Sequence, residues 1–80
     1  PQDQLPKGIQ RQTLEAIVAA LRETRDFVTQ QELAEMSGFA YQTVCRYVAH
    51  LEDEGLVEVQ LNYGQLGRPK KLVRWRDKRK

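Results

Sequence analysis

The stretch from residue 41 to residue 50 holds the side chains best suited to recognising a ligand. Gln42 and Arg46 are four residues apart, so on a helix they share one face. A glutamine amide can pair bidentately with adenine, and an arginine guanidinium with guanine. Groups suited to phosphate oxygens flank this face, and no carboxylate occurs between residues 41 and 51. These flanking residues are Tyr41, Thr43, Tyr47 and His50.

This pattern predicts a helix that reads base edges in the major groove of double-stranded DNA. The alternative for Gln42 and Arg46 is that they only solvate an exposed helix face. Tyr47 has a second alternative, which is to pack against the hairpin with its hydroxyl at the rim. The alternative for His50 is a polar residue at the surface or its boundary, without a phosphate contact.

Two adjacent helices are expected to position these groups, over residues 30–37 and 40–54. Thr29 and Glu32 form a T-x-x-E capping box at the start of the first helix, and Thr29 is also a candidate DNA contact. Ala34 allows close approach of the second helix, and Gly38 fits the left-handed turn between them. A small residue, a glycine four later and the apolar Val44 six after that are typical of a helix-turn-helix.

The rest of the chain supplies another helix and a hairpin. Leu14, Ile17, Val18 and Leu21 recur at helical spacing, which predicts a core helix over residues 9–22. Residues 27–28 are either a minimal strand or a hydrophobic staple. Residues 56–63 alternate and are expected to form a half-buried strand, and residues 71–76 alternate again and are expected to form the strand that returns beside it. The fold class is therefore mainly α with a small β-hairpin, a winged helix-turn-helix with a three-helix core.

The hairpin loop is a second candidate contact with DNA. Gly64 and Gly67 permit tight turns, and Pro69 holds Arg68 extended, which suits entry into a narrow minor groove. Lys70 and Lys71 would then lie over phosphates. The alternative is a basic hairpin with no bound partner.

Charge is distributed unevenly along these 80 residues. The net charge is +2, but residues 1–62 carry −5 and residues 63–80 carry +7. A positive field at one end indicates a polyanionic partner. Residues 1–8 are expected to be a linker, residues 9–76 the domain, and residues 77–80 a basic tail.

The composition argues against several other classes of protein. With one histidine, one cysteine and no nucleophile or phosphate-binding motif, we expect no enzyme, no metal and no cofactor. No apolar run is long enough to span a membrane, and the single cysteine cannot form an internal disulfide. We therefore expect a cytoplasmic domain of a longer protein.

Three runs of the sequence are distinctive, namely Leu5-Pro-Lys-Gly-Ile, Thr43-Val-Cys-Arg46-Tyr47 and Tyr63-Gly64-Gln-Leu-Gly67-Arg68-Pro69. They resemble the effector domain of bacterial two-component response regulators of the citrate and C4-dicarboxylate (CitB/DcuR) type. The resemblance implies a phosphorylatable receiver domain before Pro1 and control of transcription by DNA binding. Helix-turn-helix proteins often bind as pairs, so a homodimer on DNA is an option. Ala40 departs from the pattern, because such proteins often have serine there, and alanine is a poor N-cap.

The main alternative function is a winged helix that binds another protein. It would use the side of the hairpin with Tyr63 and Trp75, or the acidic edge formed by residues 52–54. The helix face with Gln42 and Arg46 has no carboxylates and is followed by a basic loop. This distribution of charge favours DNA as the partner, because binding to a protein would not require it.

Overall fold

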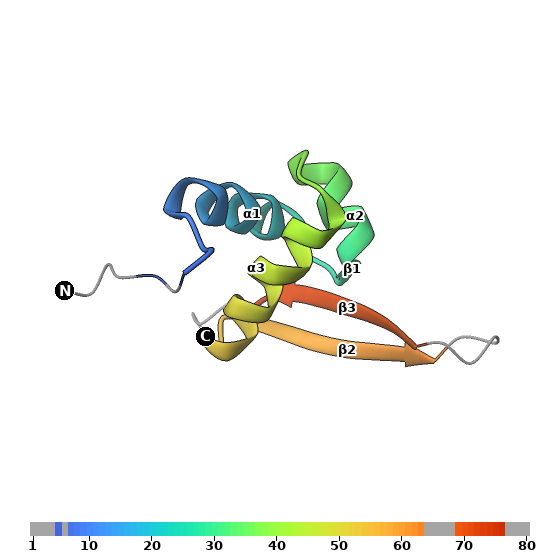
Figure 1. Ribbon diagram of the computed structural model, residues 1–80. Helices are drawn as coiled ribbons and strands as arrows, with labels where there is room; N and C mark the ends of the chain where they lie inside the picture. Colours follow the sequence, from blue (N-terminus) through green and yellow to red (C-terminus); the bar gives the residue numbers. More distant parts are fainter. Residues whose placement is uncertain (1–4, 6, 64–68, 77–80) are drawn as a thin grey trace.

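The computed structural model describes residues 5, 7–63 and 69–76. The three helices lie against a small sheet, and the β2–β3 hairpin projects beyond them (Figure 1). This arrangement confirms the predicted winged helix-turn-helix with a three-helix core. In chain order the elements are α1 (Arg11–Glu23), β1 (Val28–Thr29), α2 (Gln30–Ser37), α3 (Tyr41–Asp53), β2 (Val57–Tyr63) and β3 (Pro69–Trp75).

Helix α1 begins and ends within two residues of its predicted limits and packs by the predicted face. Ile17 and Leu21 are fully buried, and Leu14 and Val18 pack against the same core. Apolar residues at this spacing form one stripe on a helix, which is why a single face is buried.

Helix α2 has the capping box expected from its sequence. The Glu32 backbone N–H donates to the Thr29 hydroxyl oxygen over 3.0 Å, and the Thr29 N–H donates to Glu32 Oε1 over 2.9 Å. The helix ends at Gly38, whose φ of 85° is left-handed and whose N–H donates to the Ala34 carbonyl. These bonds satisfy backbone groups that a short helix otherwise leaves unpaired.

Helix α3 packs its predicted apolar face on α2 and the sheet. Val44, Val48 and Leu51 are essentially fully buried. At its start, Ala40 has an extended backbone but offers no side-chain cap, as its methyl group dictates. The turn and the buried face together fix which side of α3 faces outwards.

The sheet has three antiparallel strands in the order β1–β3–β2. Strand β1 is a minimal strand, the first of the two predicted alternatives, and Val28 pairs with Val73 of β3. On its other side Val73 pairs with Val59 of β2, and it is fully buried. The sheet therefore ties the start of α2 to the hairpin.

The prediction that β2 is half-buried along its length is wrong. Only Val57 is buried, while Val59, Leu61 and Tyr63 are 38%, 50% and 69% exposed. The strand runs past the end of the helices, so nothing in the described chain covers its far half (Figure 1). Alternation identifies residues that share a face, but it does not show that another element covers that face.

Parts of the predicted organisation lie outside the described residues. These parts are most of the predicted linker, the wing loop from Gly64 to Arg68, and the basic tail of residues 77–80. In the described part of the chain, no helix is long and apolar enough to cross a membrane.

Candidate nucleic-acid interface

The outward face of α3 carries the two residues predicted to read bases. Gln42, Arg46 and Ala49 are all exposed, opposite the buried Val44 and Val48. The burial of one face therefore places the amide and the guanidinium on the same outer side, one helical turn apart. Both groups are free to approach a groove as a pair.

Tyr41 stands at the N-terminal end of this face and is 51% exposed. A hydrogen bond and charge interaction with the neighbouring Cys45, together with slight burial, raise the pKa of the Tyr41 hydroxyl above its ordinary value. Its exposed position leaves Tyr41 a candidate contact for a phosphate oxygen. The Cys45 thiol in turn donates to Gln30 Oε1 over 3.5 Å, which links α3 to the buried Gln30 of α2.

Tyr47 does not lie on the exposed flank where it was predicted, and we remove it from the set of direct DNA contacts. It is 3% exposed and belongs to the core. Its hydroxyl accepts a 2.8 Å hydrogen bond from the Gln10 backbone N–H. The spacing contains the signal for this burial, since residues 44, 47, 48 and 51 follow the i, i+3, i+4, i+7 pattern of one helix face.

The three remaining polar candidates on the helices are only partly accessible. Thr43 and His50 on α3 are half-buried, at the edges of the face that carries Arg46. Thr29 is half-buried as well, and its hydroxyl oxygen caps α2. Capping accounts for Thr29 without a DNA contact, although its hydroxyl proton remains available to a phosphate.

The hairpin places one lysine in the open and the other beside a carboxylate. Lys70 is exposed on β3, opposite Asn62 of β2. The Lys71 ammonium lies 2.7 Å from Glu52 Oε1 near the end of α3. Glu52, the first carboxylate on α3, therefore partners one of the two predicted phosphate-binding lysines.

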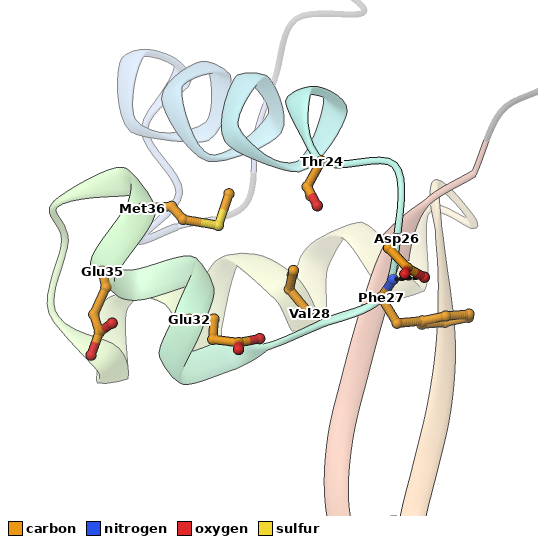
Figure 2. A pocket seen from close by; sticks show the side chains of 7 residues that line it. All are labelled: Thr24, Asp26, Phe27, Val28, Glu32, Glu35 and Met36. Carbon is orange, nitrogen blue, oxygen red and sulfur yellow. Dashed lines mark hydrogen bonds between the residues drawn. The ribbon is translucent and has the colours of Figure 1, made fainter.

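An open hollow of about 540 Å³ lies between the end of α1, β1 and α2 (Figure 2). Three carboxylates line it, from Asp26, Glu32 and Glu35, beside the side chains of Phe27 and Met36. This negative lining repels phosphates, so we place the hollow outside the interface. Within the described ranges, no group of three histidine, cysteine or acidic residues could hold a metal ion.

Comparison with known proteins identifies the family. The sequence pattern of the MarR family matches residues 7–65, which is more than half of the chain. The chain belongs to the MarR family. The match spans all three helices and strand β2, and so includes the exposed face of α3.

Relatives of this MarR-family domain are named as regulators. It is 40% identical over 67 residues to a "probable C4-dicarboxylate response regulator DctR" of Halalkalibacterium halodurans, covering 84% of this chain and 29% of that protein. It is 41% identical over 68 residues to the "transcriptional regulatory protein CitT" of the same organism, covering 84% of this chain and 30% of that one. The chain thus spans less than a third of these relatives.

The fold also matches a solved structure. A "possible transcriptional regulator" from Methanosarcina mazei Go1 superimposes with a TM-score of 0.74 at 16% sequence identity, over 88% of this chain and 58% of that one. At this identity the likeness concerns the fold alone. Together with the family match, it makes this MarR-family chain a winged-helix domain of the kind found in transcriptional regulators.

Proposed function

We propose that this domain binds double-stranded DNA sequence-specifically, with α3 in the major groove and the basic hairpin along the flanking backbone and minor groove. The observation that carries the proposal is the exposed face of α3. It presents Gln42 and Arg46 side by side, and no carboxylate lies on the helix before Glu52. An α-helix fits the major groove, and these two side chain types have bidentate partners there.

The proposed contacts fall into two groups with different roles. Gln42 and Arg46 read base edges, while Tyr41, Thr43, His50, Lys70 and Lys71 contact phosphates. Thr29 stays in the proposal only as a secondary phosphate contact at the start of α2. Arg68 is proposed to enter the minor groove on the evidence of the sequence alone.

The longer protein is proposed to be a response regulator of the citrate and C4-dicarboxylate type. The names of the relatives and their greater length support this proposal, because a receiver domain needs chain beyond these 80 residues. On this proposal the protein acts in the cytoplasm, where phosphorylation of the receiver controls how the domain engages DNA. If two domains bind together, their half-sites should be about one helical turn apart.

The test is selection of duplexes from a random pool with this chain, followed by binding to the enriched duplex and to a scrambled one. We expect a shared motif, tighter binding to the enriched duplex, and affinity that falls with salt for both duplexes. Absence of enrichment, or equal affinity for the two duplexes, would contradict sequence-specific binding.

The exposed stripe of Val59, Leu61 and Tyr63 favours a second candidate function, binding of another protein by the hairpin. Exposed apolar side chains in a row are typical of interaction surfaces. Leu61→Ser separates the candidates. A DNA-binding domain should keep its preference for the enriched duplex, whereas a protein-binding surface should lose its partner.

A further inference from the structure

Residues 7–10, predicted to lie at the junction of linker and domain, run beside the core and α3. Ile9 packs against the hydrophobic core, and Gln10 donates its backbone N–H to the buried Tyr47 hydroxyl over 2.8 Å. Gly8 has a φ of 88°, in the left-handed region that favours glycine. We call residues 7–10 the arm, and it is held to the core by Ile9 and to α3 by Gln10.

The arm lies against the residue proposed to read guanine. A Cβ atom built on Gly8 would be 3.7 Å from Arg46 Nη1 and 3.9 Å from Arg46 Cδ. The glycine backbone therefore runs alongside both the stem and the charged end of Arg46. Lys7, the next residue towards the N-terminus, is exposed.

A free arginine side chain samples many rotamers, and ordering it at an interface costs conformational entropy that weakens binding. Packing against a fixed segment removes part of that freedom before binding. Tyr47 fixes the arm through Gln10, and the arm flanks Arg46, the neighbour of Tyr47 on α3. This chain of contacts gives the buried tyrosine hydroxyl a role beyond core packing.

We propose that the arm is part of the DNA-reading surface, in which Gly8 and Tyr47 are positioning residues for Arg46 and Lys7 adds a phosphate contact. The inference rests on the proposed DNA binding and extends it to a segment predicted as linker. Recognition then involves two separate parts of the chain, the arm before α1 and the face of α3.

The first test removes the hydroxyl that holds the arm. Tyr47→Phe keeps the aromatic ring in the core but takes away the acceptor for Gln10. In the free protein, we expect the Gln10 amide to exchange with solvent at least tenfold faster, which reports arm docking without DNA. With the enriched duplex, we expect several-fold weaker binding and a smaller preference at the base pair that Arg46 reads.

The second test uses two glycines with similar backbones and different surroundings. Gly8→Ala places a methyl group against Arg46, whereas Gly55, with a φ of 73°, has nothing within 4 Å of its Cβ position. Both substitutions strain a left-handed residue, so both should lower the melting temperature. Only Gly8→Ala should reduce the preference at the base pair that Arg46 reads. When Arg46 is already replaced by alanine, Gly8→Ala should cause no further loss of that preference.

The outcomes separate the two proposals. If the wild type discriminates between duplexes but Tyr47→Phe and Gly8→Ala keep the full preference, the arm has no part in reading DNA. Equal effects of Gly8→Ala and Gly55→Ala on base preference would overturn the inference in the same way. A wild type that binds every duplex equally would instead overturn the proposed function, and the role of the arm with it.

Discussion

Lys71 shows at the residue scale how one side chain can have two competing partners. Its ammonium is paired with Glu52 in the free domain, and both side chains are about one-third exposed. An ion pair this close to solvent contributes roughly 0–1 kcal/mol to stability. A DNA phosphate is an equally good partner for the ammonium. Because Lys71 must leave Glu52 to bind a phosphate, Glu52 reduces the binding free energy that this contact contributes.

Glu52→Gln is therefore expected to strengthen binding to every duplex, by roughly two- to fivefold at low salt. The neutral amide releases Lys71 and removes a charge that repels phosphates. The plot of log affinity against log salt concentration should steepen by up to about one. Fluorescence anisotropy at several salt concentrations measures both quantities.

Glu54→Gln is the matched control, since it removes a nearby charge at the exposed end of α3 without touching the Lys71 pair. It should give a smaller gain and leave the salt slope unchanged. The same gain and slope from both variants would show that general charge, not the release of Lys71, sets the affinity.

At the scale of elements, the helix-turn-helix is held by different means at its two helix starts. Helix α2 has a complete capping box, whereas α3 begins at Ala40 without a side-chain cap. The Ala40 backbone, at φ −64° and ψ 151°, already has the extended form of an N-cap. Helix α3 therefore begins with backbone N–H donors that the side chain of a serine at position 40 could satisfy.

Opposite changes at these two caps should have opposite effects on stability. Thr29→Ala should lower the free energy of unfolding by about 0.5–2 kcal/mol, and Ala40→Ser should raise it by a similar amount. Urea denaturation of both variants measures this. Two changes of the same sign would contradict the role assigned to the caps.

Local patterns predicted the elements better than the contacts between them. The bounds of α2 and the buried face of α3 followed from capping signals and helical spacing. The buried Tyr47 followed from the same spacing, but its polar hydroxyl led to its assignment to the surface. The Lys71–Glu52 pair and the contact of Gly8 with Arg46 join residues far apart in sequence, and no local pattern encodes them.

At the scale of the whole molecule, acidic and basic surfaces lie on different parts of the fold. The hollow beside α2 is lined by carboxylates, whereas residues 69–76 hold four lysines and arginines and no acidic residue. On the proposed function, a duplex is attracted by the hairpin and its base sequence is read by α3. In this account, sequence preference comes from α3 with its arm, and attraction independent of sequence comes from the hairpin.

This division of roles has a direct test, in which wild type, Arg46→Ala and Lys70→Ala are measured on the enriched duplex and all its single base-pair variants. We expect Arg46→Ala to lose about 1–3 kcal/mol of discrimination at one base pair, leaving the other positions intact. Lys70→Ala should weaken binding to all duplexes equally and reduce the salt slope by about one. If Arg46→Ala keeps the wild-type preference at every position, α3 does not read DNA in the way proposed.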